Sequence, residues 1–362
     1  MSTPPDLIDR LRLIRTPGIG PMAYRQLIAR FGSAGAALEA IPDLARRGGG
    51  QPPVIHPRRL AEEEIASVDR LGARFLVAGE GLYPRLLAAL EHAPPLLIAK
   101  GRLELFERPQ VAIVGARNAS AAACRFARGL ARELGGEGVV IVSGLARGID
   151  AAAHDGAMDS GTIGCAAGGI DVFYPPENEE RQKRMWTDGL VLSERPPGLE
   201  PRSRDFPRRN RIIAGLAAGT VVVEAAPRSG SLITARLAAE AGREVMAVPG
   251  SPLDPRAQGC NQLIRDGATL VQNAADVLEM IRPLVGRVES IRDPFEGAPL
   301  IEATGDARER IEALLGPSAV PVDEIVRLAE AEPGEVQLVL LELDLAGRID
   351  RHAGGKVSLR AA

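Results

Sequence analysis

Short runs of apolar residues alternate with helical patterns through the middle of the chain. The first two runs, VAIVG at 111–115 and VVIVSG at 139–144, each end in glycine before a helical pattern begins. Similar apolar runs lie at 162–166, 190–193, 220–224 and 244–248, and helical patterns lie at 119–134, 146–159, 209–217 and 232–241. Apolar runs without alternation are typical of strands buried on both faces. The pattern therefore predicts an α/β fold with a Rossmann-like, doubly wound, mostly parallel sheet.

A helical module is predicted ahead of this sheet, over residues 1–75. Its first helices, within 7–41, are separated by the turn Pro17-Gly18-Ile19-Gly20-Pro21, in which the glycines allow positive φ. This turn resembles a helix-hairpin-helix, whose amides contact nucleic-acid phosphate. The alternative is a small helical docking module that uses the same turn only for packing, and we favour it because a five-residue hairpin signal is weak alone. A helix at 58–71 and a strand at 73–78 lead into the core, which we predict over 76–284.

The end of the chain has the pattern of a winged helix. Residues 285–300 combine charges, glycine and proline and are predicted to be a linker; the winged helix follows over 301–362. Its third helix, predicted at 334–346, contains Glu335, Glu342 and Asp344 and no lysine or arginine. Because duplex phosphates would repel this helix, we expect the module to bind protein, or to fold back on the core and regulate it.

Composition places the chain among soluble globular proteins, with 45% hydrophobic and 25% charged residues among 362. Neither a signal peptide nor an apolar run of roughly 18 residues is present, so we expect a cytoplasmic protein without membrane contact. The cysteines Cys124, Cys165 and Cys260 are widely spaced and form no CxxC pair. We expect them to be reduced, and we predict no metal site.

Two neighbouring strand ends carry groups suited to binding anions. At the first, Gly115 would let the backbone approach a ligand, and Arg117 would offer a bidentate guanidinium. At the second, Ser143 and Gly144 would offer a hydroxyl and free amides, followed by Arg147. The segment GARNAS lacks the later glycines of a dinucleotide fingerprint. We therefore predict no cofactor at this edge.

The helix after the second strand places Asp150 and His154 four residues apart, as a carboxylate and a base would be. The sequence shows no nucleophile beside them. We therefore expect Asp150 to cap amides or orient Arg147, and His154 to be a local partner. No catalytic residue is predicted.

The strongest signal is an arginine cluster, RSRDFPRRNR at 202–211. Five of its ten residues are arginine, and one aromatic ring lies among them. Cations for phosphates and a ring for base stacking are the needs of single-stranded nucleic acid. A further anion-binding turn follows the strand at 220–224. The candidate binding residues here are Arg204, Phe206, Arg208, Arg209, Asn210, Arg211, Ser229, Gly230 and Ser231.

These motifs, together and in this order, resemble the DNA-processing protein A (DprA/Smf) family. The resemblance rests on VAIVGAR, VSGLARGIDAAAH, IDVFYPPEN, LSERPPG, FPRRNRIIAGL, VVEAAPRSGSLITARLAAEAGREVMAVPG and GCNQLIRDGATLV, which cover roughly residues 80–275. It implies a Rossmann-like core, an N-terminal module similar to a SAM domain, and, as in some members, a C-terminal winged helix.

The resemblance also implies a function and partners. Members bind and protect single-stranded DNA during natural transformation, help load the RecA recombinase, act as dimers and need no known cofactor. By position, Arg117 and the segment 206–211 fall on the family's DNA groove. The segment 261–270 falls where the core dimerises, with contacts from Asn261, Leu263, Ile264 and Leu270; an ordinary core helix and strand remain the alternative there.

The main rival function is that of the nucleoside-monophosphate phosphoribohydrolases, which have a distantly similar core. Their PGGxGTxxE loop binds phosphate and places a catalytic glutamate, whereas the comparable loop here is APRSGSLITA. Its only glycine is Gly230, and Thr234 or a neighbour stands where the acid is needed, so hydrolysis loses its acid/base. A third possibility is a regulator that binds duplex DNA through the tail.

Overall fold

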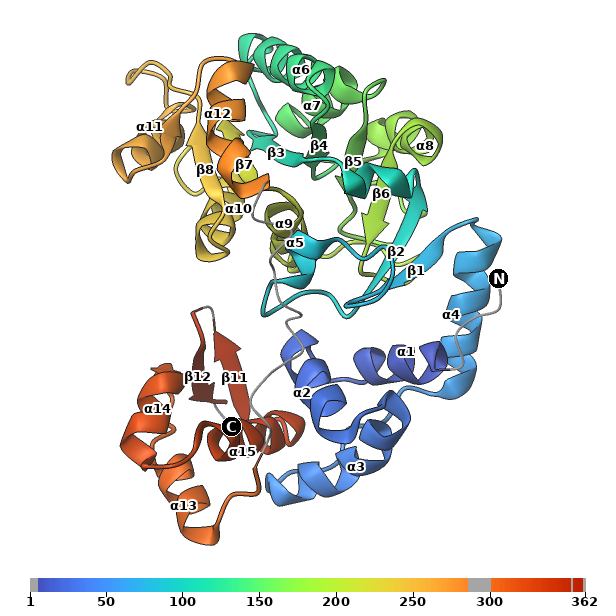
Figure 1. Cartoon of the computed structure of the whole chain (residues 1–362), viewed down its shortest axis with the longest axis vertical. Helices are drawn as coiled ribbons and strands as arrows, with labels where there is room; N and C mark the ends of the chain where they lie inside the picture. Colours follow the sequence, from blue (N-terminus) through green and yellow to red (C-terminus); the bar gives the residue numbers. More distant parts are fainter. Residues whose placement is uncertain (1–5, 286–300, 353, 361–362) are drawn as a thin grey trace. The chain divides into compact units, whose positions relative to one another are not determined.

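The computed structural model describes residues 6–285, 301–352 and 354–360, and divides into two compact units (Figure 1). The core unit comprises Ala66–Asp293; the terminal unit combines Met1–Ile65 with Pro294–Ala362. The N-terminal module and the winged helix, predicted as separate domains, thus cluster in one unit. Except for Val285, the predicted linker 285–300 lies outside the described residues.

The core unit is a nine-stranded sheet flanked by helices. Its strands are β1 (Arg74–Val77), β2 (Leu96–Gly101), β3 (Gln110–Gly115), β4 (Val140–Ser143), β5 (Thr162–Cys165), β6 (Leu190–Ser193), β7 (Gly219–Val223), β8 (Glu244–Ala247) and β9 (Thr269–Leu270). Its helices are α5 (Arg85–Ala88), α6 (Ala121–Gly136), α7 (Ile149–Ala157), α8 (Glu179–Asp188), α9 (Asp205–Leu216), α10 (Gly230–Glu240), α11 (Gln258–Arg265) and α12 (Ala274–Val285), with the 3₁₀ turns η1 (Leu103–Glu107) and η2 (Pro176–Asn178).

The strand order β1-β2-β6-β5-β4-β3-β7-β8-β9 confirms the doubly wound, mostly parallel sheet. From β3 the chain winds outward through β4, β5 and β6, then returns to β7 on the other side of β3. Ligands of such sheets bind outside the carboxyl ends of the strands, near the point where the winding reverses. Here that point lies between β3 and β7.

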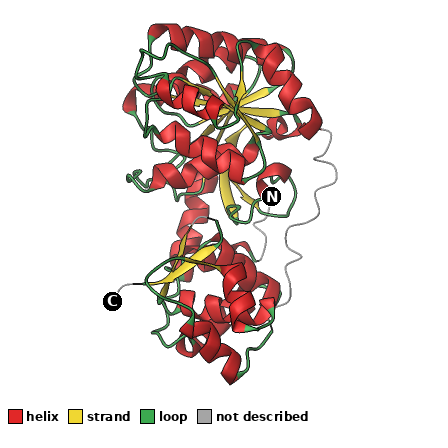
Figure 2. Ribbon diagram, turned by 90° about the vertical axis from the view of Figure 1, so that its left-hand side faces the viewer, coloured by secondary structure: helices red, strands yellow, loops and turns green. Residues whose placement is uncertain are grey.

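Two antiparallel strands at one edge of the sheet were not predicted as a pair. The pattern of apolar residues predicted no strand at β2, which pairs antiparallel with both β1 and β6. Figure 2 shows the core strands between helices on both faces. On one face, α6, α7 and α12 cover an apolar cluster that includes Val111, Ile113 and Ile141.

A carboxylate joins the loops that follow β3 and β7. Glu224, directly after β7, accepts hydrogen bonds from the Ser120 amide (2.8 Å) and hydroxyl (2.6 Å). The Ser120 hydroxyl also accepts from the Ala123 amide and so caps α6. The first turn of α6 is thereby held against the end of the neighbouring strand.

The terminal unit combines helices from both ends of the chain with a small sheet. Its N-terminal part contains α1 (Leu7–Arg15), α2 (Pro21–Phe31) and α3 (Ala34–Arg47), and α4 (Arg58–Arg70) spans the boundary with the core unit. Its C-terminal part contains α13 (Gly305–Ala313), β10 (Val320–Pro321), α14 (Val322–Ala329), α15 (Pro333–Leu345), β11 (Ile349–His352) and β12 (Lys356–Leu359). The sheet order is β10-β12-β11, which completes the predicted winged helix.

Gly115 is required by packing between β3 and its neighbours, rather than by the approach of a ligand. A Cβ at Gly115 would lie 1.9 Å from the Val223 carbonyl oxygen and 2.6 Å from Cγ1 of Ile149. Protein atoms therefore fill the space that the sequence suggested for a ligand.

We expect Gly115→Ala to lower the free energy of unfolding by about 1 to 3 kcal/mol, because the strands must shift to admit one methyl group. Gly129→Ala, in the middle of α6 with no atom within 4 Å of the new Cβ, is the matched control. It should be neutral or stabilising by up to about 1 kcal/mol. Urea unfolding of both variants measures the difference; equal stability would show that β3 tolerates a side chain there.

Candidate nucleic-acid interface

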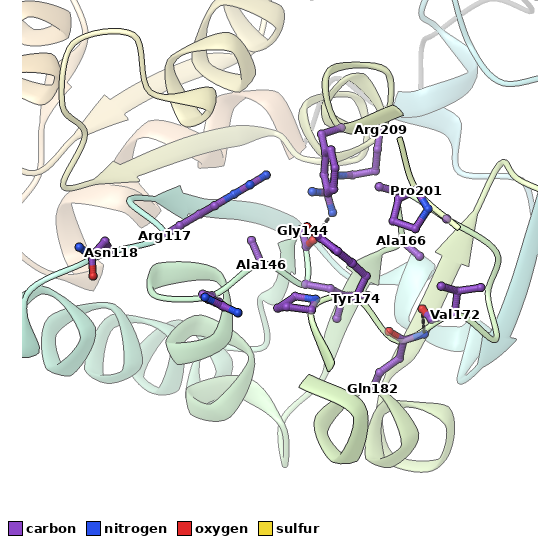
Figure 3. A pocket seen from close by; sticks show the side chains of 16 residues that line it. Arg117, Asn118, Gly144, Ala146, Ala166, Val172, Tyr174, Gln182, Pro201 and Arg209 are labelled. Atoms are coloured by element: carbon purple, nitrogen blue, oxygen red, sulfur yellow. Dashed lines mark hydrogen bonds between the residues drawn. The ribbon is translucent and has the colours of Figure 1, made fainter. Parts of the chain in front are cut away.

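A pocket opens at the carboxyl ends of β3, β4 and β5 and beside the start of α9 (Figure 3). Both polar and aromatic residues line it. They are Arg117, Asn118, Gly144, Leu145, Ala146, Arg147, Ala166, Ala167, Gly168, Val172, Tyr174, Pro175, Gln182, Pro201, Phe206 and Arg209. Of the predicted binding residues, the pocket brings together Arg117, Gly144, Arg147, Phe206 and Arg209.

An arginine and two aromatic rings form a ledge at this pocket, which we call the aromatic ledge: Arg117, Phe206 and Tyr174. The Arg117 guanidinium carbon lies 4.9 Å from the Phe206 ring centroid, a cation–π distance. The Phe206 and Tyr174 centroids are 5.5 Å apart at an interplanar angle of 51°. Arg117 is exposed and Tyr174 is 46% exposed, so a positive charge and part of an aromatic side chain are accessible to solvent at the ledge.

Tyr174 lines the pocket but was not among the binding residues predicted from the sequence. It lies in the motif IDVFYPPEN. A large exposed aromatic in a motif that follows a strand end was the available signal. Its ring contact with Phe206 joins two segments that are 32 positions apart in the sequence.

The loop after β4 is held from within the protein. The Gly144 and Ala146 amides both donate to Oδ2 of Asp150, at 3.2 and 3.3 Å. Asn178 donates to the carbonyls of Leu145 (2.8 Å) and Ala146 (3.2 Å), and Leu145 has a φ of 56°, a strained value for a leucine. Asp150 thus caps amides, one of the roles expected for it.

The free hydroxyl and amides expected at this strand end are therefore not found. Ser143 is fully buried and its hydroxyl donates to the Ile113 carbonyl at 2.6 Å. The Gly144 amide is taken by Asp150, whose carboxylate stands where a ligand phosphate would have to bind. The β4 loop shapes the wall of the pocket and does not supply its anion site.

Arg209 lies behind this loop as a buried cation. Arg209 is buried, and its Nη1 donates to the Gly144 carbonyl (Figure 3). The same nitrogen donates to the Cys165 carbonyl. Burial raises the pKa of the Asp150 carboxyl, against the opposing effect of Arg209 and the two loop amides. Burial likewise lowers the pKa of Arg209, and Asp150 opposes that shift. Each of the two charges thus favours the ionised form of the other behind the β4 loop.

The arginine cluster divides into exposed and engaged members. Arg202, Arg204 and Arg208 are exposed. Arg211 instead donates to the Glu194 carboxylate at 2.6 Å and to the His92 carbonyl at 2.5 Å. The sequence predicted one uniform basic segment; in the structure, Arg209 and Arg211 hold α9 in place while the other three face solvent.

The remaining predicted residues lie beside α9 or at the rim of the pocket. Asn210 is buried and donates to the Gly230 carbonyl at 3.3 Å, which ties α9 to the turn that opens α10. In that turn the hydroxyls of Ser229 and Ser231 are 2.8 Å apart, and Ser229 caps the helix. Arg147 is exposed and forms an ion pair with Glu177.

His154 has no access to a ligand. It is fully buried on α7, and its Nδ1 lies 2.7 Å from the Thr162 hydroxyl. That hydroxyl donates to the Ile141 carbonyl, so His154 Nδ1 must be the donor of the pair. Burial lowers the pKa of His154 to about 3. It is a neutral structural partner of Thr162, as expected.

No cluster of three or more metal-binding side chains occurs within residues 6–285, 301–352 and 354–360. Over the same parts of the chain, none of the helices combines the length and the apolar character needed to cross a membrane. The three cysteines form no disulfide; Cys165 and Cys260 are buried.

Comparison with known proteins identifies the family. A family model described as DNA recombination-mediator protein A matches residues 74–282. Models of a DprA-like N-terminal HHH domain and a DprA winged helix domain match residues 5–67 and 296–355. The chain belongs to the DprA/Smf family. The sequence-based resemblance is confirmed, as is the predicted fold class with its two flanking modules.

Individual DprA/Smf proteins are similar over most of their length. The chain is 31% identical to Protein Smf of Synechocystis over 95% of this chain and 96% of that protein. The structure of DprA from Streptococcus pneumoniae, at 37% identity, covers 77% of this chain and 98% of that one with a TM-score of 0.61. DprA from Helicobacter pylori, described with a single-stranded DNA binding mode, is 30% identical with a TM-score of 0.53, and covers 59% and 96%.

We expect the His154 imidazole to stay neutral down to about pH 4, because its folded pKa is about 3. The unfolded chain takes up this proton near pH 6.5, so His154 contributes stability that is lost progressively as the pH falls from about 6.5 towards 3. Imidazole ¹⁵N chemical shifts against pH measure the titration. A His154 pKa near 6.5 in the folded protein would contradict its assigned burial.

Proposed function

We propose that this protein binds single-stranded DNA without sequence preference, with the aromatic ledge as its base-contacting surface. The observation that carries the proposal is the ledge itself: an exposed arginine stacked on a phenylalanine that contacts a half-exposed tyrosine. Stacking on such rings is worth about 1 to 3 kcal/mol per base and tolerates any base. In duplex DNA the bases are stacked on each other and are not available to stack on these aromatic rings.

The charges around the ledge support a phosphate-tracking path. Arg202, Arg204, Arg208 and Arg228 are exposed in the segments that flank the pocket, and Arg117 lies at its mouth. Each phosphate contact releases counterions, so affinity should fall steeply with salt. A path of several separate cations suits a polyanion better than one small anion.

The buried Asp150 carboxylate favours single-strand binding over nucleotide hydrolysis. A nucleotide-binding core needs free amides at a strand end, yet the Gly144 and Ala146 amides are occupied by Asp150. In the loop comparable to that of the hydrolases, Thr234 or a neighbour stands where the acid is needed, and Thr234 is buried. We therefore propose a protein without enzymatic activity, and without a cofactor; nucleotide hydrolysis is the alternative.

We further propose the finer family role: protection of single strands and delivery of them to the RecA recombinase in the cytoplasm, during DNA uptake and recombination. The description of the matched family as a DNA recombination mediator supports this role. The free cysteines fit a reducing compartment.

The proposal is tested by titrating fluorescent single-strand and duplex oligonucleotides with wild type, Phe206→Ala, Arg117→Ala and Arg117→Lys. We expect Phe206→Ala to weaken single-strand binding by roughly 5- to 150-fold, the equivalent of about 1 to 3 kcal/mol. Arg117→Ala should also lower the slope of log K against log salt by about 0.7, the value of one phosphate contact. Arg117→Lys should keep the slope and lose part of the affinity.

Arg132→Ala, an exposed arginine on α6 that does not line the pocket, is the matched control and should bind like wild type. Nucleoside monophosphates are incubated in parallel and assayed for base release. Equal affinity for both forms of DNA, or base release together with unchanged binding by Arg117→Ala, would overturn the proposal in favour of the alternatives.

We also propose that the core forms a homodimer through its α11 and β9 edge. Among the residues that the structure describes, β9 pairs with β8 alone and ends the sheet, and Leu270 on it is 40% exposed. Leu263 and Ile264 on α11 are half-buried. The Asn261 amide group instead bonds the Gly250 backbone at 3.0 and 3.1 Å, so its role is to hold the preceding loop. An exposed apolar edge strand is a ready surface for association.

We expect the double variant Ile264→Asp/Leu270→Asp to halve the solution mass, because two carboxylates would be buried at the contact. Leu253→Asp is the control: this leucine is 92% exposed in the loop before α11, and its change should leave the mass unaltered. Light scattering after size exclusion gives the result. A monomeric wild type, or a double variant that remains dimeric, would place the interface elsewhere or remove it.

A further inference from the structure

The third helix of the winged helix, α15, has apolar residues on two opposite faces. Nine of its 13 residues are buried. Val336, Val339, Leu340 and Leu343 pack in the core of the winged helix, whereas Leu338, Leu341 and Leu345 belong to a different cluster. The spacing of this second set, three and four residues apart, makes a continuous stripe along the helix. A helix that reads duplex DNA would instead expose that face to the major groove.

The second stripe is covered by the N-terminal module. Leu338, Leu341 and Leu345 share one cluster with Ile41, Leu44 and Ala45 of α3, and all six are buried. The two helices are neighbours in the terminal unit (Figure 1). A single apolar cluster is therefore built from residues about 300 positions apart in the sequence.

Two glycines after α3 allow backbone to lie against backbone at this contact. A Cβ at Gly48 would be 2.1 Å from the Glu342 carbonyl oxygen, and one at Gly50 would be 2.4 Å from the Ala346 carbonyl oxygen. Neither glycine has a positive φ, so their conformation does not require glycine. Glycine is required at both positions because the backbone of α15 lies where a Cβ atom would be.

Polar contacts surround the apolar cluster. Gln26 donates to Gln337 at 2.6 Å, Arg348 donates to the Gly48 carbonyl at 3.2 Å, and Arg47 contacts Glu302 at 3.1 Å. Glu342 is fully buried; its carboxylate pairs with Arg308 of α13, and Arg47 of α3 lies 3.8 Å away. The charge on α15 that would repel DNA is thus neutralised partly from the N-terminal module.

We propose that the winged helix is a protein-docking module whose partner is the N-terminal helical module of its own chain. The two ends of the chain fold as one cooperative unit, and the core is inserted between its halves in the sequence. The helix α15, whose counterpart in duplex-binding winged helices enters the major groove, is buried in this unit. The proposal does not depend on single-strand binding by the core, because each contact on which it rests lies in the terminal unit.

Cooperativity makes a change at one end of the chain measurable at the other. Hydrogen exchange is measured on the full-length protein and on Leu341→Asp and Gly48→Val. We expect Leu341→Asp to accelerate exchange in α3 at least about tenfold, and Gly48→Val to do the same in α15, because each variant opens the shared contact from one side. Added short duplex should leave exchange of α15 unchanged.

Two controls separate the contact from general damage. Gly35→Ala, within α3, places its Cβ 3.5 Å from Asp9 and meets nothing else. Leu328→Asp changes a leucine of α14 that is 46% exposed. Both should exchange like wild type in α3 and α15. If Leu341→Asp accelerates exchange only within residues 301–360, or if duplex protects α15 while α3 loses protection, the proposal is overturned.

A second measurement covers the case in which Leu341→Asp unfolds the winged helix alone. A protease site is inserted after Glu289, and the full-length protein is cut there and passed over a size-exclusion column. The C-terminal fragment of wild type should co-elute with the rest, and that of Gly48→Val should elute separately. Release of the wild-type fragment would overturn the proposal.

Discussion

The carboxylate of Asp150 occupies the place at which a Rossmann-like core would ordinarily bind a ligand phosphate. It accepts from two amides of the loop after β4, with the buried guanidinium of Arg209 behind that loop. A buried charge is tolerated only with partners of this kind, since desolvation of an unpaired ion costs several kcal/mol. Because Asp150 engages the Gly144 and Ala146 amides, the groups that the pocket still offers to a ligand are side chains, among them those of the aromatic ledge.

Because charges that are removed from solvent need polar partners, the arginines near α9 fall into two groups. Arg209 and Arg211 donate to backbone carbonyls, and Arg211 also to a carboxylate, so they hold the helix; Arg202, Arg204 and Arg208 remain exposed. A DprA/Smf protein therefore uses one short segment both to anchor a helix and to present charge. Which arginine serves which purpose depends on the atoms that surround it.

The winged helix shows how burial changes the meaning of a sequence feature. The absence of basic residues on α15 first indicated a module that avoids duplex phosphates, with the core as one expected partner. The structure instead packs α15 against α3, and gives Glu342 a buried ion pair with Arg308. Gly48 and Gly50 allow the close contact that this packing needs.

Much of the fold follows from the chain alone. Uninterrupted apolar runs predicted the parallel strands, and β6 has the residue bounds expected from the pattern, because the periodicity of burial is a local property. The arginine cluster and Phe206 were likewise visible, since they are neighbours in sequence. The tertiary structure alone decided the pairing of β2, the contact of Tyr174 with Phe206, the filling of the β4 loop by Asp150 and the union of the two chain ends. Each of these joins groups separated along the chain, or depends on which atoms already satisfy a hydrogen bond, and neither is encoded in local periodicity.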